Sequence, residues 1–248
     1  MSNSPSVAEI AALVGNPARA NVLVALLDGR ALTATELAFV AHVSPQTTSG
    51  YLADLTAAGL LTRRKQGRNS YYQLASHLIG QMLESIMAVA SNNEPARQPR
   101  WKGDEALRAA RLCYDHLAGK LGVSLADARQ ERGCLILSED GGEVTPAGAS
   151  FLSDVGIDLP AAKQRRRIFC RPCLDWSERR SHLAGAVGAA LAARCFELRW
   201  IERLRDGRAV TITEEGARGF AVTFGIAIAI QATNSGASQV PEPLRTSY

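Results

Sequence analysis

Cys170 and Cys173 have the C-x-x-C spacing of reactive thiols and lie among basic residues. The run from Asp175 to Glu178 matches a capping box and predicts a helix that follows directly. Cys173 would then lie just before a helix N-terminus. Both the helix dipole and the nearby arginines favour its thiolate form. Such a thiol can form a reversible disulfide with its neighbour or bind a soft metal or metalloid.

The same stretch allows two other interpretations. Its aromatic and charged side chains could line a pocket for an organic ligand, because an aromatic wall with a few directed polar groups is usual in such sites. Alternatively, the cysteines are small buried hydrophobes with a structural role. The candidate effector residues are Cys170, Cys173, Asp175, Trp176, Arg179 and Arg180.

We assign no metal site and no cofactor from the sequence. A closed zinc site needs three or four convergent ligands. The C-x-x-C pair has no second pair, although Cys113, Cys134, His116 or His182 could supply ligands through the fold. Both histidines belong to a repeated H-L-A-G. The small residues beside them favour a role in packing or capping.

A second group of residues has the composition of a DNA-reading surface. On a helix predicted over 45–58, the exposed N-terminal turns carry polar side chains that can reach base edges, as Gln does with adenine. A basic turn follows, which should contact phosphates or a minor groove. The candidate DNA-binding residues are Gln46, Thr47, Ser49, Gly50, Tyr51, Arg63, Arg64, Lys65 and Arg68.

Local signals predict the elements that position this surface. Thr33 and Glu36 form a capping box that begins one helix, and Ser44 with Pro45 begins the next. Strand, turn and strand follow over residues 60–74, and further helices are predicted over 7–14, 17–27 and 76–90. The order of these elements is that of a winged helix-turn-helix, which lays one helix in the DNA major groove.

The segment from about residue 7 to residue 90 resembles an ArsR-type (arsenic-repressor-like) regulator. The resemblance rests on E-L-A at 36–38, V-S at 43–44, Q-T-T-S at 46–49, A-G-L at 58–60 and Y-Y-Q-L at 71–74, among other matches. It implies a homodimer that binds a palindromic operator on double-stranded DNA, usually as a repressor released by an inducer. Residues 1–112 lack cysteine, and the last predicted dimer helix lacks a second His at ligand spacing. The family's usual metal-sensing sites are therefore not expected.

The second half contains an internal repeat. The segment at 113–125 recurs at 180–191, and the segment at 141–157 recurs at 207–226. We expect each copy to hold a helix with H-L-A-G-x-x-G, a second helix, a V-T hairpin and a closing helix. The predicted fold is mainly α with small β-hairpin wings: a winged helix-turn-helix plus a duplicated, winged-helix-like C-terminal domain. The expected boundaries are 1–92 for DNA binding and dimerisation, 93–103 for a linker, 104–232 for a sensor domain and 233–248 for a tail.

Composition adds few constraints. The net charge is +4, and residues 1–94 carry equal numbers of basic and acidic side chains, so attraction to DNA must come from local clustering. The chain starts without a signal-peptide pattern, and its longest apolar run is short and interrupted. We therefore expect a cytoplasmic location with reduced thiols and no membrane partner.

Together these features predict a transcriptional regulator, most simply a dimeric repressor whose C-terminal domain senses a thiol-reactive, metal or small organic signal. The main competing interpretation is a thiol oxidoreductase-like enzyme fused to a DNA-binding module, and a third is an architectural DNA-binding protein without an effector. The second half contains no glycine-rich nucleotide loop after a strand, no P-loop and no Ser/His/Asp arrangement. We therefore predict that the chain is not an enzyme.

Overall fold

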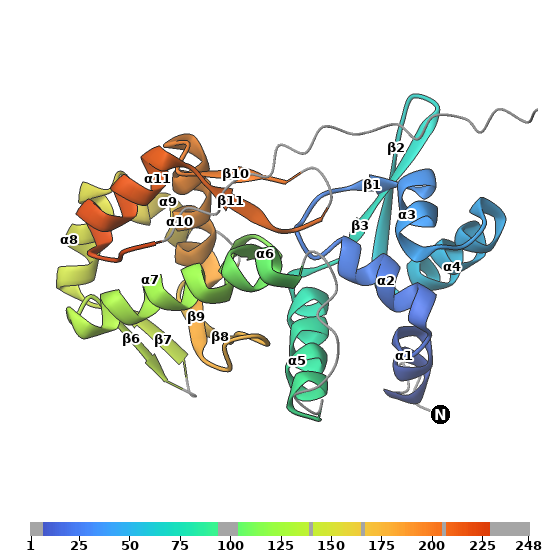
Figure 1. Ribbon diagram of the computed structural model, residues 1–248. Coiled ribbons are helices and arrows are strands. Elements are labelled where there is room, and N and C mark those ends of the chain that lie inside the picture. Colours follow the sequence, from blue (N-terminus) through green and yellow to red (C-terminus); the bar gives the residue numbers. More distant parts are fainter. Residues whose placement is uncertain (1–6, 94–103, 139–140, 165–166, 205–206, 229–248) are drawn as a thin grey trace, which may run out of the picture.

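The computed structural model describes residues 7–93, 104–138, 141–164, 167–204 and 207–228. These residues form two parts that lie side by side in Figure 1, with the N-terminal part in blue and cyan and the C-terminal part in green to red. Most of the predicted linker and all of the predicted tail lie outside the described residues. No helix in the described part of the chain is long and apolar enough to cross a membrane.

The N-terminal part has the elements of a winged helix-turn-helix. The helices are α1 (Val7–Val14), α2 (Pro17–Ala25), α3 (Ala34–Ala41), α4 (Pro45–Ala57) and α5 (His77–Asn93), and the strands are β1 (Leu32–Thr33), β2 (Leu61–Gln66) and β3 (Asn69–Leu74). The strands form one antiparallel sheet in the order β1-β3-β2. The expected order of elements is confirmed, and the β2–β3 hairpin is the wing.

The predicted helix caps of this part are present. Thr33 accepts a hydrogen bond from Glu36 N while the Glu36 carboxylate accepts one from Thr33 N, which is a complete capping box. Ser44 Oγ accepts from Thr47 N at the start of α4. The helices pack on a leucine-rich core to which α2, α3, α4, the wing strands and α5 all contribute.

The C-terminal part repeats one order of elements: hairpin, helix, hairpin, helix. The first copy comprises β4 (Arg111–Cys113), β5 (His116–Ala118), α7 (Gly119–Glu131), β6 (Leu135–Ser138), β7 (Gly141–Val144) and α8 (Pro146–Asp154). The second comprises β8 (Arg171–Leu174), β9 (Ser181–Ala184), α10 (Gly185–Glu197), β10 (Ile201–Arg203), β11 (Val210–Ile212) and α11 (Glu214–Gly219). Helix α6 (Asp104–Ala109) precedes the first copy, α9 (Leu159–Lys163) separates the copies, and the π-helix η1 (Phe220–Phe224) follows the second.

The opening of each copy differs from the expectation. The H-L-A-G sequences were expected to lie within helices, but His116–Ala118 and His182–Ala184 are strand residues, and each helix begins at the following glycine. The first glycines of the two motifs, Gly119 and Gly185, have φ of +74° and +85°. This left-handed conformation favours glycine and allows an abrupt change from strand to helix.

The second glycines of the motif hold the two copies together. Helix α7 packs on β9, and α10 packs on β5, so each helix covers the hairpin of the other copy. A Cβ atom on Gly122 would lie 2.4 Å from the Leu117 carbonyl oxygen and 3.6 Å from His182 Cβ. On Gly188 it would lie 2.4 Å from the Leu183 oxygen and 3.3 Å from His116 Cβ.

Gly122→Ala is therefore expected to destabilise the protein by about 1–3 kcal/mol, because the added methyl group has no room and its main obstacle is backbone. Urea unfolding followed by circular dichroism measures the change. The matched control is Gly50→Ala in α4, where an added Cβ meets nothing within 4 Å. That variant should gain up to about 1 kcal/mol, since glycine disfavours a helix interior. Equal effects of the two substitutions would contradict the packing argument.

Buried contacts join the two parts of the molecule. Glu84 of α5 and Arg208 form an ion pair, and their side chains are only 2% and 6% exposed. The Tyr114 backbone, in the β4–β5 turn, donates a hydrogen bond to the Leu27 carbonyl, and the Tyr114 ring lies against Gly80. Arg30 also donates to the Gly207 carbonyl at 3.1 Å. The C-terminal part is thus in direct contact with α5 and with the residues that follow α2.

Candidate DNA-binding surface and a buried cysteine–histidine cluster

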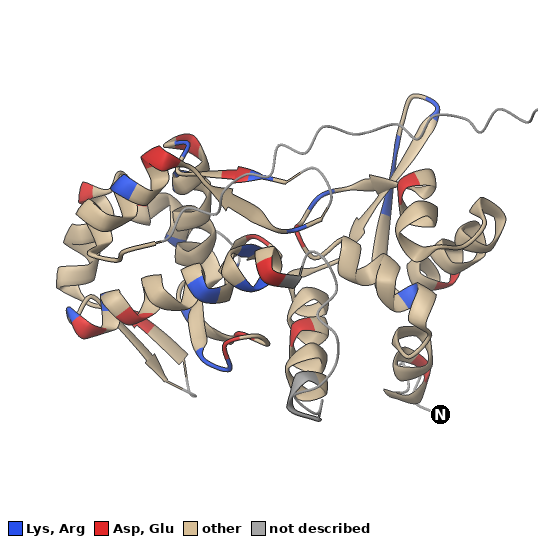
Figure 2. Cartoon of the chain, in the orientation of Figure 1, with Lys and Arg blue, Asp and Glu red and all other residues tan. Residues whose placement is uncertain are grey.

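Helix α4 presents the predicted base-reading residues on its exposed side. Leu52, Leu55 and Thr48 face the core, and the Thr48 hydroxyl donates to the Ser44 carbonyl. The side chains of Gln46, Thr47 and Ser49 are exposed, and open space surrounds Gly50. The helix carries no Lys or Arg, and its ribbon in Figure 2 has no blue segment. This surface is therefore suited to hydrogen bonding rather than to charge attraction.

Tyr51 is the exception among the predicted readers, because it is already engaged. The Arg19 guanidinium of α2 lies over its ring, 4.9 Å from the centroid, and also forms a 2.6 Å ion pair with Asp54. The sequence prediction missed Arg19, which lies 35 residues from Asp54 in the chain. Its position in the first turn after the Asn16 cap gave no sign that it faces α4.

The wing carries the predicted cations. Residues 63–66 of β2 are exposed, as is the turn at Gly67 and Arg68. Figure 2 shows these basic residues along the hairpin, which projects beyond the helices. Arg63 donates to the Ser70 hydroxyl across the hairpin at 3.0 Å, which fixes its direction. The predicted base-reading residues thus lie on a helix without cations, and the predicted phosphate contacts lie on the wing.

The C-x-x-C interpretation requires correction. Cys173 lies on strand β8 and Cys170 just before it, and side chains three residues apart along an extended chain point to opposite faces. The two thiols accordingly belong to different buried clusters. Burial raises the pKa of Cys170 to about 11, so this thiol stays protonated. Cys173 lies at no helix N-terminus, because α10 begins only at Gly185.

Asp175 does not begin a helix of its own, contrary to the sequence expectation, but its carboxylate accepts a hydrogen bond at 2.6 Å from Gly119 N, at the start of α7. Its carboxylate accepts from Ser177 N and Glu178 N in the turn between β8 and β9, and pairs with Arg111 at 2.9 Å. Both side chains of this pair are fully buried. Trp176 lies against the Arg108 and Arg111 guanidinium groups.

The two remaining candidate effector residues lie at the surface. Arg179 is exposed with φ of +56°, and Arg180 is exposed and pairs with Asp127 at 2.7 Å. Of the six predicted effector residues, Cys173 lines the cleft between α5 and β8, and the other five are not among its described lining residues.

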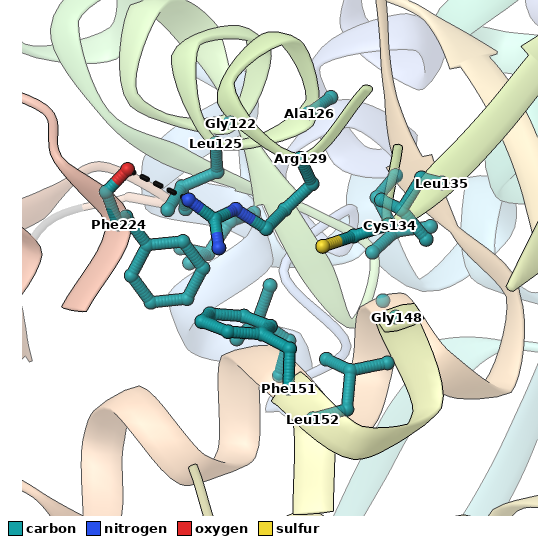
Figure 3. A pocket seen from close by; sticks show the side chains of 14 residues that line it. Gly122, Leu125, Ala126, Arg129, Cys134, Leu135, Gly148, Phe151, Leu152 and Phe224 are labelled. Carbon is teal, nitrogen blue, oxygen red and sulfur yellow. Dashed lines mark hydrogen bonds between the residues drawn. The ribbon is translucent and has the colours of Figure 1, made fainter. Parts of the chain in front are cut away.

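This cleft lies between α5 and β8 and has a volume of about 330 Å³. Its lining residues from α5 are Gln81, Glu84, Ser85, Ala88 and Val89, and those from β8 are Arg171, Pro172, Cys173 and Leu174. A second, apolar cavity lies inside the C-terminal core (Figure 3), where Arg129 stacks on Phe151 and donates to the Phe224 carbonyl. Its volume of about 10 Å³ is roughly that of one water molecule. Of these two cavities among the described residues, the cleft against α5 is the one with room for a small organic molecule.

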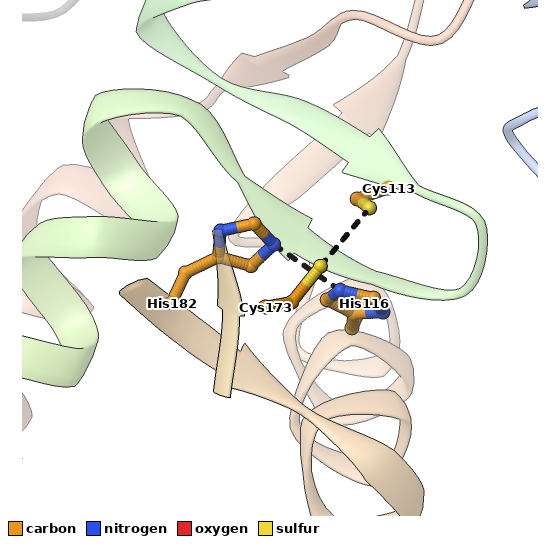
Figure 4. A group of neighbouring side chains, drawn as sticks. All are labelled: Cys113, His116, Cys173 and His182. Atoms are coloured by element: carbon orange, nitrogen blue, oxygen red, sulfur yellow. Dashed lines mark hydrogen bonds between the residues drawn. The ribbon is translucent and has the colours of Figure 1, made fainter. Parts of the chain in front are cut away.

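The fold brings together four side chains that the sequence did not connect. Cys113, His116, Cys173 and His182 are buried, and one ligand atom from each lies within 4.8 Å of the others. Cys113 Sγ is 3.9 Å from Cys173 Sγ, and the Nε2 atoms of the two histidines are 3.2 Å apart. Figure 4 shows the four side chains converging from the two hairpins. The hydrogen bond from Cys113, helped by the two histidines, holds the pKa of Cys173 well below its usual range, which favours a thiolate inside the cluster.

The similarities to known proteins cover both parts of the chain. A family model described as MarR family matches residues 16–69. A Bacillus subtilis (strain 168) protein described as the uncharacterized HTH-type transcriptional regulator YdfF is 41% identical over 217 residues, 88% of this chain and 96% of that protein. An alignment of this length includes most of the C-terminal part.

Two solved structures resemble the N-terminal part. The first is the homodimeric winged helix-turn-helix DNA-binding domain of Mb0332 from Mycobacterium bovis, a possible ArsR-family regulator. It is 20% identical with a TM-score of 0.34, over 40% of this chain and 99% of that one. The second is reduced HlyU from Vibrio cholerae N16961, which is 28% identical with a TM-score of 0.31, over 33% of this chain and 85% of that one.

Proposed function

Because this chain belongs to the helix-turn-helix (HTH)-type transcriptional regulators, we propose that it binds operator DNA as a homodimer and that its C-terminal part controls this binding. The observation that carries the proposal is the exposed polar edge of α4 beside the basic wing. The motifs of residues 36–74 favour an ArsR-type repressor within this class. The proposal includes no catalytic activity.

The proposed division of roles separates output from input. Residues 1–92 bind DNA and dimerise, 93–103 link the parts, 104–232 sense a signal and 233–248 form a tail. Two observations support a sensing role: the cleft of about 330 Å³ lies against α5, and the buried Glu84–Arg208 pair joins α5 to the C-terminal part. A ligand in the cleft would touch α5 directly. Either a small organic ligand or a thiol-reactive or metal signal remains a candidate effector.

The DNA-binding proposal is tested by selecting operator sequences from a random duplex library with the full chain, followed by affinity measurements on the winners. Gln46→Ala is expected to change base preference at one position of each half-site, with a loss of about 1–3 kcal/mol on the preferred base. Affinity for unrelated DNA should stay the same. The matched control is Arg218→Ala, an exposed residue of the C-terminal part. Failure to select any sequence, or equal losses on every sequence for Gln46→Ala, would contradict the assignment.

The homodimer is expected to form through α1 and α5. Helix α1 buries none of its residues, Val7 is 86% exposed, and Leu78 and Ile86 of α5 are 63% and 46% exposed. Both helices extend away from the wing tip in Figure 1, so a partner there leaves the wing free. Apolar exposure of this extent on the two helices supports an interface there.

Leu78→Asp is therefore expected to weaken dimerisation by roughly 100-fold or more, because the interface would bury an unpaired carboxylate. Sedimentation equilibrium measures the dissociation constant. Ile136→Asp is the control, since Ile136 is 53% exposed on β6 in the other part. A Leu78→Asp chain that remains as dimeric as Ile136→Asp would exclude this interface.

A further inference from the structure

We propose that Cys113, His116, Cys173 and His182 form a binding site for one tetrahedrally coordinated divalent metal ion, with Zn²⁺ as the best fit. This inference concerns the C-terminal part alone and does not depend on DNA binding. It assigns a role to two cysteines and two histidines that the proposed DNA-binding surface leaves unused.

The distances within the cluster are those of a zinc site. With Zn–S near 2.3 Å and Zn–N near 2.05 Å, a tetrahedral ion sets its two sulfurs about 3.8 Å apart and its two nitrogens about 3.3 Å apart. The observed separations are 3.9 Å for Cys113 Sγ to Cys173 Sγ and 3.2 Å for His116 Nε2 to His182 Nε2. All four atoms also lie within 4.8 Å of one another, so one ion can reach them together.

The internal repeat builds this site symmetrically. Cys113 is directly opposite His116 in the β4–β5 hairpin, and Cys173 is directly opposite His182 in the β8–β9 hairpin. Each hairpin thus presents one thiol and one imidazole from paired positions, and the close packing of the copies brings the pairs together. A bound ion would cross-link the two copies at the centre of the C-terminal part.

A carboxylate lies near Nδ1 of each imidazole. Asp115 Oδ1 lies 3.4 Å from Nδ1 of His116, and the Asp115 carboxylate is paired with Arg167. Asp175 Oδ2 lies 3.5 Å from Nδ1 of His182, and the Asp175 carboxylate is paired with Arg111. The hydrogen bond between Asp115 and Nδ1 of His116 places the proton there and leaves the Nε2 lone pair for a metal, as metal-ligating histidines commonly show. Nδ1 of His182 makes no such hydrogen bond to Asp175.

The donor set selects the class of ion. Two sulfurs and two imidazole nitrogens in a tetrahedral arrangement suit Zn²⁺, whereas Mg²⁺ and Ca²⁺ require oxygen ligands. His116 and His182 are 2% and 0% exposed, and Cys113 and Cys173 are 2% and 7% exposed. Because all four ligands come from the protein and are buried, the ion would have no open coordination position. Structural zinc sites are closed in this way, whereas catalytic zinc sites keep one position open.

The site also reaches the DNA-binding part. Tyr114 lies between two of the ligands, and its backbone and ring contact Leu27 and Gly80. Cys173 lines the cleft beside α5. An ion that fixes these ligands therefore also fixes the turn and the strand that contact α5.

The first test is metal content of the full chain, purified under reducing conditions, loaded with Zn²⁺ and dialysed. Wild type should retain about one Zn²⁺ per chain, as a closed four-ligand site does. Cys113→Ser and Cys173→Ser should lower the retained Zn²⁺ more than tenfold. Cys195→Ser is the matched control, because Cys195 is a buried thiol of the same part outside the cluster. Wild type without bound Zn²⁺, or equal loss in Cys195→Ser, would overturn the proposal.

A second test guards against variants that fail to fold. Co²⁺ in place of Zn²⁺ should give the visible bands of tetrahedral Co²⁺ and a near-ultraviolet thiolate charge-transfer band. His182→Cys keeps four ligands and should strengthen the charge-transfer band, because it adds a third thiolate. Octahedral Co²⁺ spectra, an unchanged band in His182→Cys, or a Cys113–Cys173 disulfide that persists in the reduced preparation would overturn the proposal. None of these readouts involves DNA, so they are independent of operator binding.

Discussion

Replacing Lys65 and Arg68 together with alanine is expected to weaken binding to every DNA sequence by roughly 10³-fold near 0.1 M salt. Both cations are exposed at or beside the wing tip. If each meets one phosphate, a dimer loses four contacts, and the slope of log K against log salt should fall by about 3.6, since each neutralised phosphate contributes about 0.9. Fluorescence anisotropy over a series of salt concentrations measures both quantities.

The wing variant has a clear contrast in Gln46→Ala, which should change base preference and leave the salt slope intact. Arg218→Ala serves as the control for a lost surface charge, since this exposed arginine lies in the other part of the molecule. An unchanged salt slope in the double wing variant would show that the hairpin does not approach the DNA backbone. Such a result would not contradict the proposed role of α4 in base recognition.

Glu84→Ala is expected to lower the free energy of unfolding by about 3–5 kcal/mol, because it leaves the Arg208 guanidinium buried without its counter-ion. The two side chains are 2% and 6% exposed, and the remaining neighbour of Arg208 on α5 is the Met87 sulfur at 3.7 Å. Urea unfolding monitored by circular dichroism gives the difference. The pair joins α5 to the C-terminal part. In Glu84→Ala, the two parts should therefore lose contact with each other at a lower urea concentration than in the wild type.

An exposed ion pair supplies the comparison for Glu84. Glu197 and Arg194 on α10 are 63% and 31% exposed and lie 3.1 Å apart, so Glu197→Ala should cost no more than about 1 kcal/mol. A double variant with methionine at both 84 and 208 should recover much of the loss, because apolar side chains can replace a buried pair. Equal losses for Glu84→Ala and Glu197→Ala would mean that the buried pair adds nothing to stability.

Helix α5 is the element that connects the proposed metal site to the proposed DNA-binding surface. The C-Y-D-H turn that holds Cys113 and His116 touches the residues after α2 and Gly80 of α5, and α5 also carries the apolar side chains expected to form the dimer. A change in the cluster therefore has a short route to the arrangement of the two DNA-binding surfaces. The cluster and α5 are connected by direct contacts between residues, without further elements between them.

The DNA-binding part was readable from the sequence because its signals are local. The Thr33 and Ser44 caps are made by residues three positions apart, and the wing turn is specified by Gly67 and its neighbours. The exposed edge of α4 follows from helical periodicity. The role of Arg19 could not be predicted in this way, because its contacts with Tyr51 and Asp54 are made between two helices.

The opening of each repeat was misjudged for an equally physical reason. A run as short as H-L-A-G fits either a helix or a strand, and periodicity alone does not separate the two. The second H-L-A-G run lies in strand β9, and the strand that pairs with it, β8, contains Cys173. Because side chains three residues apart along an extended chain point to opposite faces, Cys170 and Cys173 do not pair. Asp175 accordingly lies in the β8–β9 turn, where it pairs with Arg111 and accepts from Gly119 N of α7 instead of capping a helix that follows it in the chain.

The sequence alone thus determined the winged helix-turn-helix and the residues exposed on α4, and it revealed the repeat. Only the tertiary structure decided which cysteines and histidines meet. Cys113 and Cys173 are 60 residues apart, and His116 and His182 are 66 apart. The loop between Cys and His is longer in the second hairpin, which concealed that each copy carries the same pair. Their convergence depends on two copies packing against each other through Gly122 and Gly188, a contact that no local pattern encodes.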